Sequence, residues 1–188
     1  YEIPKRDWSS EVCSSDLIEA LAPHQALGWS LDCVGSTERD PATTEAVQGL
    51  IAHFGFEQQI RLHGELSDAA LDQLWREADL FVLPSYHEGY GMVFTEAIAR
   101  GLPVIATRAG AIPETVPSQA SRLVDPGDTA ALSAVLGELI GDPSSRAQLA
   151  EQALTARSDL TDWPRAVDRW IAAMDLLVAS KFSNRVAA

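Results

Sequence analysis

The sequence predicts an α/β domain of the Rossmann-like, doubly wound type, in which helices cover both faces of a parallel sheet. From residue 29 onward, short apolar runs alternate with helical patterns, as successive β–α–β units require. The run DLFVLP, residues 79–84, is apolar on both sides of a strand, which is typical of a parallel sheet covered on both faces. Ligands are therefore expected at the carboxyl ends of the strands.

Five runs are short, mostly apolar and bounded by turn residues. Runs of this length favour strands over helices. The expected strands are WSLDCV (29–34), QIRLHG (59–64), DLFVLP (79–84), PVIAT (103–107) and SRLVD (121–125).

The helices are indicated by the residues at their ends. After the first strand, Asp40 is suited to an N-cap, Pro41 fits the first helical position, and Gly55 can end the helix. By the same signals we expect helices at residues 41–55, 67–78, 92–101, 128–141, 142–157 and 164–180, the last three being extra C-terminal helices.

The composition is that of an acidic globular protein. Of 188 residues, 14 are Lys or Arg and 27 are Asp or Glu, which gives a formal net charge of −13. Nucleic-acid binding is not expected, because phosphate backbones need clustered cations. Cys13 and Cys33 form neither a metal-ligand pattern nor a disulfide framework, which predicts a reduced, cytoplasmic setting. No apolar run approaches the roughly 20 residues of a membrane span, so none is expected.

One stretch, SYHEGYGMVFTEAIARGLPV at residues 85–104, combines a predicted strand end, two glycines and a helix start. Gly89 and Gly91 permit positive φ and close backbone approach. The helix is expected to begin near Gly91, with the N–H groups of residues 91–94 directed at the crevice. The start of a helix carries partial positive charge and binds phosphate. This site would allow an acidic chain with few cations to bind an anionic ligand.

The same stretch carries two glutamates, one on each side of the glycines. Glu96, in the second helical turn, can accept hydrogen bonds from vicinal hydroxyls, as the acidic residue of dinucleotide sites does with ribose. Glu88 lies on the loop before the glycines. This order suggests a nucleotide-sugar, with ribose at Glu96, diphosphate on the N–H groups and sugar near Glu88. The alternative is that Glu96 is an exposed helix residue and Glu88 a solvated loop charge.

The segment PSYHEGYGMVFTEAIARGLPVIATRAGAIPE, with HGELS upstream and TRAGAIPETV overlapping its end, resembles the C-terminal, donor-binding half of retaining glycosyltransferases, especially glycosyltransferase family 4. The similarity runs from about Asp16 to Trp170. The resemblance implies the GT-B fold, which consists of two Rossmann-like domains with a cleft between them. It also implies a nucleoside-diphosphate sugar as donor substrate, with no metal and no other cofactor.

By this resemblance Glu88 is the catalytic candidate, because it contacts the donor sugar, and Glu96 binds the ribose hydroxyls. Residues 89–93 would hold the sugar and phosphates through their backbone, and residues 64–66 would line the nucleobase. The complete set of candidate substrate-binding residues is Gly64, Glu65, Leu66, Gly89, Tyr90, Gly91, Met92, Val93, Glu96 and Gly110.

Four neighbouring residues are given other roles. His63 is expected to be a strand-end packing residue, and Arg108 is expected to form a surface salt bridge rather than meet phosphate. Glu114 is expected to cap its loop or pair with a charge there. For His87, contact with ligand and exposure to solvent remain equal alternatives.

Two features depart from the family pattern. The N-terminal acceptor domain is absent, so we expect a fragment that needs this domain as its partner. Residues 1–15 lack the hydrophobic strand and the basic stretch ending in Lys-Gly that open this domain in the family, and RDWSSEVCSSDL resembles translated adapter sequence. The predicted division is an anomalous, candidate non-native segment at 1–15, a nucleotide-sugar-binding domain at 16–162, and a C-terminal helix and tail at 163–188.

The expected function is donor binding by a retaining, hexosyltransferase-type glycosyltransferase that moves a sugar from a nucleoside-diphosphate sugar to an acceptor. The isolated chain is expected to be inactive. The alternative is a non-catalytic nucleotide-sugar-binding module or subunit, and a third hypothesis is an unrelated flavodoxin-like binding domain. Adding a separately expressed N-terminal half distinguishes the first two, because only an enzyme fragment would regain sugar transfer.

The apolar stripe of the last helix is expected to pack on its own domain, with a crossing to the partner domain as the alternative.

Overall fold

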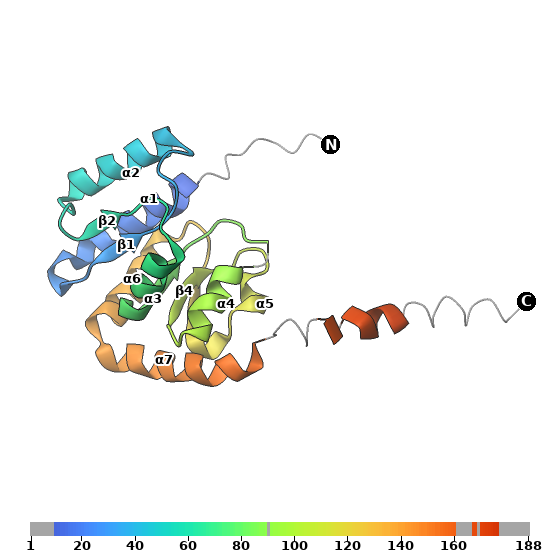
Figure 1. Ribbon diagram of the computed structural model, residues 1–188. Helices are drawn as coiled ribbons and strands as arrows, with labels where there is room; N and C mark the ends of the chain where they lie inside the picture. Colours follow the sequence, from blue (N-terminus) through green and yellow to red (C-terminus); the bar gives the residue numbers. More distant parts are fainter. Residues whose placement is uncertain (1–9, 90, 161–166, 169, 177–188) are drawn as a thin grey trace, which may run out of the picture. The chain divides into compact units, whose positions relative to one another are not determined.

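The structure is a computed structural model that describes residues 10–89, 91–160, 167–168 and 170–176 (Figure 1). The chain divides into two units, Tyr1–Ser158 and Asp159–Ala188. The strands and α-helices that are labelled below belong to the first unit. Of the helix predicted at 164–180, the described residues 167–168 and 170–176 are helical. Its other residues lie outside the described part of the chain.

Each of the five predicted strand runs contains a strand, and all observed pairings are parallel. β1 pairs with β2, and β3, β4 and β5 pair in that order. The α/β class with parallel strands is thus confirmed, although the described residues form a two-stranded and a three-stranded sheet rather than one sheet. The strands are β1 (Leu31–Cys33), β2 (Ile60–Leu62), β3 (Phe81–Leu83), β4 (Val104–Thr107) and β5 (Ser121–Val124).

The predicted helix caps are present. Asp40 accepts a hydrogen bond from the Thr43 N–H, and Asp128 accepts one from the Ala131 N–H. The helices are α1 (Ser10–Leu21), α2 (Pro41–Phe54), α3 (Asp68–Glu77), α4 (Met92–Ala99), α5 (Ile112–Thr115), α6 (Thr129–Gly141) and α7 (Pro143–Ala156), with short 3₁₀ segments η1 (Ala22–Leu27), η2 (Ser118–Ala120) and η3 (Arg157–Asp159). Among the described residues, no helix combines the length and apolar character needed to cross a membrane.

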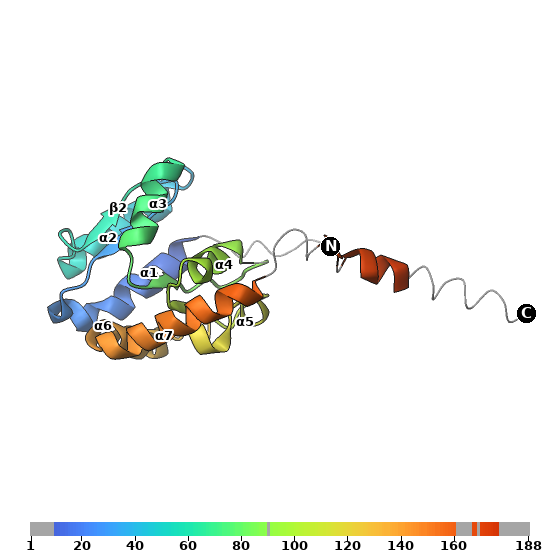
Figure 2. The ribbon, with the colours of Figure 1, turned by 60° about the horizontal axis from the view of Figure 1, so that its bottom comes forward.

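The core of the first unit lies around β4. All four β4 residues are buried. α1 packs against α2 and α6, and α7 runs along α4 and α6 (Figure 2). The side chains of the main buried cluster come from α1, α2, α6 and β4 and include Leu17, Ile18, Val47, Ile51, Ile105, Leu132, Leu136 and Leu139.

The apolar run at residues 79–84 is less covered than its sequence indicates. Phe81, Val82 and Leu83 are all only half-buried. The expected covering from both faces is therefore incomplete. Among the described residues β3 pairs along one edge alone, and the other edge borders a cavity.

Candidate functional site

The loop that follows β3 begins at Ser85, which is hydrogen-bonded to the last residue of β4. The Thr107 hydroxyl donates a hydrogen bond to the Ser85 carbonyl, and both residues are buried. Since β3 and β4 are parallel, their carboxyl ends meet at this edge of the sheet. The candidate loop therefore leaves the sheet where ligand sites of α/β domains are found.

A second hydrogen bond joins the main chain of Glu88 to the loop after β4. The Ala111 N–H donates to the Glu88 carbonyl over 3.1 Å. Gly110 has φ +54°, and a Cβ atom there would lie 2.2 Å from that same carbonyl oxygen. Only glycine permits this approach, so Gly110 supports the main chain of Glu88 directly.

The carboxylate of Glu88 lies at the start of α4. Its Oε1 accepts a hydrogen bond from the Gly91 N–H over 3.2 Å. Gly91 is the N-cap of α4 and has φ +79°, and a Cβ atom there would lie 2.8 Å from the Phe94 ring. Glu88, Gly91 and Gly110 thus form one connected group, as their predicted shared role requires.

The free N–H groups at the start of α4 are fewer than predicted. The Gly91 N–H is used by Glu88, and the Phe94 N–H donates to the Gly91 carbonyl over 3.0 Å. Met92 and Val93 supply the remaining first-turn N–H groups, which a helix leaves without intrahelical acceptors. An anion would therefore meet two N–H groups here, unless it displaced the Glu88 carboxylate from Gly91.

Glu96 is exposed in the second turn of α4 and lines a cavity of about 730 Å³ together with Val93. Of the predicted site residues that the structure describes, only these two line it. Glu88 does not, so the two glutamates do not enclose one pocket within this unit.

The predicted nucleobase loop, residues 64–66, lies at the carboxyl end of β2. Gly64 has φ +69°, and its carbonyl accepts a hydrogen bond from the Gly35 N–H over 3.0 Å. Its observed contacts therefore join it to the loop after β1 rather than to α4. Of the remaining predicted residues, Glu65 and Gly89 are exposed, and Tyr90 lies outside the described residues.

Of the roles expected for the neighbouring residues, the surface salt bridge of Arg108 is confirmed. His63 Nε2 lies 2.7 Å from Asp32 Oδ1, so its partner is a carboxylate on β1. Arg108 pairs with Asp125 at 3.2 Å, and both side chains are more than half exposed. His87 and Glu114 are exposed.

Tyr86 is a residue of this region that the sequence reasoning missed. Its hydroxyl donates to Asp16 Oδ2 over 2.7 Å. A Cβ atom on Gly127 would lie 3.0 Å from the Tyr86 hydroxyl oxygen. The hydrogen bond to Asp16, together with desolvation, raises the pKa of Tyr86 to about 12. The hydrogen bond joins α1 to the loop after β3. No local pattern predicts a contact between residues so distant in sequence.

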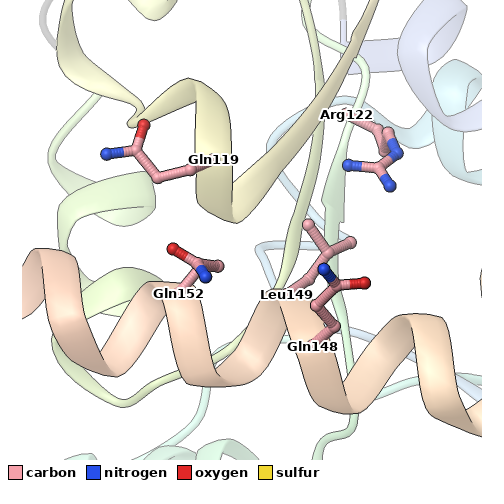
Figure 3. A pocket seen from close by; sticks show the side chains of 5 residues that line it. All are labelled: Gln119, Arg122, Gln148, Leu149 and Gln152. Atoms are coloured by element: carbon pink, nitrogen blue, oxygen red, sulfur yellow. The ribbon is translucent and has the colours of Figure 1, made fainter.

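A smaller cavity of about 290 Å³ lies between α7 and the segment that enters β5 (Figure 3). Gln119 and Arg122 border it from η2 and β5, and Gln148, Leu149 and Gln152 from α7. Because it adjoins the amino end of β5, it lies away from the carboxyl-end loops of the candidate site. Within the described part of the chain, no group of three or more His, Cys, Asp or Glu side chains is arranged to hold a metal ion.

Comparison with known proteins gives consistent matches. Residues 14–155 match the family model of glycosyl transferases group 1. The chain is similar to the MMP alpha-(1->4)-mannosyltransferase of Mycolicibacterium hassiacum, with 35% identity over 141 residues. That match covers 74% of this chain and 33% of the relative, so the chain spans about a third of the relative's length.

Two solved structures share the fold. One is the C-terminal domain of a glycosyl transferase group 1 family protein from Francisella tularensis, with a TM-score of 0.71 and 27% identity, covering 80% of this chain and 80% of that chain. The other is HepE of Anabaena, solved in complex with UDP, with a TM-score of 0.71 and 25% identity. The second match covers 94% of this chain and 46% of that one.

Proposed function

The chain belongs to the glycosyl transferases group 1 family, and we propose that it is the donor-binding domain of a retaining glycosyltransferase of the GT-B type. The whole enzyme would transfer a sugar from a nucleoside-diphosphate sugar to an acceptor held by a second domain. The observation that carries the proposal is the connected group of Glu88, Gly91 and Gly110 at the carboxyl ends of β3 and β4.

In this proposal the start of α4 binds the diphosphate. The N–H groups of Met92 and Val93 are oriented by the helix before any ligand arrives. As the bond between sugar and diphosphate breaks, negative charge grows on the departing phosphate oxygens. Preorganised donors stabilise that charge without having to reorient, which lowers the barrier. We assign this role to main-chain amides.

Glu88 is assigned to the donor sugar. Its Oε1 is held by the Gly91 N–H, and its main chain is held by the loop at Gly110. The second carboxylate oxygen is then suited to accept a hydrogen bond from a sugar hydroxyl. A glutamate held both by its carboxylate and by its main chain can position the donor sugar reproducibly for attack by the acceptor.

Glu96 is assigned to the ribose, and residues 64–66 to the nucleobase. Glu96 is exposed and lines the larger cavity beside Val93, so its carboxylate is accessible to vicinal hydroxyls. The complex of HepE with UDP supports a nucleoside diphosphate as the ligand of this fold. The relative's greater length leaves room for the acceptor domain that the proposal requires.

The test is calorimetric titration of the chain with UDP, GDP and ADP. We expect one of them to bind, and Glu96→Ala to weaken that binding about tenfold or more, because a charged hydrogen-bonding partner contributes roughly 1.5–3 kcal/mol. Glu96→Gln should fall between, since its amide oxygen still accepts a hydrogen bond without the charge.

The matched control is Glu151→Ala, which removes an exposed glutamate from α7. It should bind the nucleotide as the unmodified chain does. Equal affinity of the Glu96 and Glu151 variants would remove Glu96 from the site. Absence of binding to all three diphosphates would reject the proposed function.

A further inference from the structure

The loop after β3 is bonded to the end of β4 at two main-chain points. The Ser85 carbonyl accepts a hydrogen bond from the Thr107 hydroxyl, and the Glu88 carbonyl accepts one from the Ala111 N–H over 3.1 Å. A segment held at two points can still turn about the line that joins them. A third contact away from that line is therefore needed to fix the direction in which the loop presents its side chains.

Tyr86 lies between these two points in the sequence and contacts a different element. Its hydroxyl donates to Asp16 Oδ2 of α1 over 2.7 Å. Desolvation raises the pKa of the Cys13 thiol, also on α1, and a hydrogen bond from the Tyr86 main chain opposes that rise. Both the side chain and the main chain of Tyr86 therefore contact α1, so this residue supplies the third contact.

The loop after β5 leaves room for the phenol at this position. Gly127 has φ +77°, and a Cβ atom there would lie 3.0 Å from the Tyr86 hydroxyl oxygen. A larger residue would press on the oxygen that Asp16 holds, whereas glycine fits without strain. Three segments that are far apart in the sequence, namely α1 and the loops after β3 and β5, thus meet at one hydroxyl group.

The contribution of Tyr86 comes from its hydroxyl more than from burial of its ring. The residue is 40% exposed, so its ring removes only part of its apolar area from water. Its hydrogen bond is made to a carboxylate, and bonds to ionised acceptors are stronger than those between neutral groups. Because Tyr86 precedes Glu88 by two residues, a rotation of the main chain at Tyr86 is passed directly to the Glu88 side chain.

We propose that Tyr86 is a positioning residue whose hydrogen bond to Asp16 sets the orientation of Glu88 toward the donor sugar. This inference rests on the proposed function, in which the Glu88 carboxylate binds the sugar and main-chain amides of α4 bind the diphosphate. Tyr86 acts through the loop and binds neither group itself. Its loss should therefore weaken recognition of the sugar, which needs an accurately placed carboxylate, and leave recognition of the diphosphate unchanged.

The first test measures the order of the loop without any ligand. Tyr86→Phe keeps the ring and removes only the hydroxyl. Amide hydrogen exchange, followed by NMR, reports on the Gly91 and Ala111 N–H groups, which donate to the Glu88 carboxylate and carbonyl. We expect both amides to exchange about tenfold faster in the variant, because loss of a hydrogen bond to a carboxylate makes local opening of the loop easier by about that factor.

Variants of Asp16 separate the hydrogen bond from other effects. Asp16→Ala removes the acceptor and should match Tyr86→Phe, and the double variant should show no further increase, because both changes break the same bond. Asp16→Asn keeps an acceptor oxygen and should restore slow exchange. The matched control is Ser121→Ala, which removes a hydrogen bond of 2.9 Å to the Pro117 carbonyl at the amino end of β5. It should leave both loop amides unchanged, even where it lowers Tm.

The second test compares each diphosphate with its sugar nucleotide by calorimetry, using UDP and UDP-glucose, GDP and GDP-mannose, and ADP and ADP-glucose. For the pair that binds, Tyr86→Phe should weaken the sugar nucleotide about tenfold and the diphosphate less than about twofold, and Asp16→Asn should bind both as the unmodified chain does.

Equal losses for the two ligands of a pair, or unchanged exchange at Gly91 and Ala111, would overturn the inference. Absence of binding to all six ligands would reject the proposed function instead. In that case the exchange rates would still decide whether Tyr86 orients Glu88.

Discussion

β3 and β4 are adjacent, parallel and similarly apolar, yet they differ in burial. Val104 and Ile105 of β4 are completely buried, whereas Phe81 and Val82 beside them in register are half-buried. β4 has a strand on both edges, and β3 has one among the described residues. Burial of a strand therefore depends on its neighbours in the sheet as much as on its own side chains.

The difference extends to the loops that follow. The loop after β3 is fixed by contacts from the end of β4, through Thr107 and Gly110, and not by β3 itself. The well-packed strand thus provides the rigidity that positions Glu88.

The largest loss of stability is expected at Gly110, where the loop after β4 contacts the loop after β3. Gly110→Ala places a methyl group 2.2 Å from the Glu88 carbonyl at φ +54°, so the loops must separate. We expect a loss of about 2–5 kcal/mol in the free energy of unfolding, measured with urea, from the left-handed backbone and the overpacking. The control Gly49→Ala, within α2 and open to space, should instead stabilise by roughly 0.5–1 kcal/mol.

A valine-to-alanine substitution made in each strand tests whether β3 is less well packed than β4. Val104→Ala should cost about 2–3 kcal/mol, since it removes fully packed methyl groups, and Val82→Ala should cost about 1 kcal/mol or less. Urea unfolding of both variants measures the difference. Equal losses would show that β3 is as well packed as β4.

A smaller effect is expected from the hydrogen bond between the strand ends. Thr107→Val keeps the side-chain shape but leaves the buried Ser85 carbonyl without its donor. This should lower stability by about 1–2 kcal/mol in thermal or urea unfolding. Thr107→Ser retains the hydroxyl, so if it proves as unstable as the valine variant, the lost methyl group rather than the hydrogen bond is responsible.

The smallest effect is expected where β4 emerges into solvent. Arg108→Ala breaks an exposed ion pair with Asp125, and such pairs contribute about 0–1 kcal/mol. Stability should change by less than about 0.5 kcal/mol, and calorimetric affinity for the bound nucleotide should stay the same. A tenfold weaker affinity would instead assign Arg108 to the phosphates.

Much of the fold follows from local sequence. The apolar runs, the Asp40 and Asp128 caps and the N-cap at Gly91 depend on residues within a turn or a strand of one another. The contact between Glu88 and Gly91 is also local, because the two residues are three apart in sequence. These features were predictable because each depends on residues of a single short segment.

Other features depend on segments that meet only in the folded chain. The contact of Gly110 behind Glu88 and the hydrogen bond of Tyr86 to Asp16 could not be derived from spacing. The separation of Glu96 from Glu88 belongs here too, because it depends on which cavity each side chain lines.

Local sequence was sufficient to predict the five strands, the helices α2, α3, α4, α6 and α7, and the glycine-containing turn that carries the acidic pair, but not α1 or α5. Periodicity and capping act over a few residues, so they are written into each segment. Which strand edges are paired depends on the tertiary structure, because pairing is a property of two segments that the chain brings together from a distance. The difference in pairing between β3 and β4 within the described residues is therefore visible in the structure and in no single stretch of the sequence.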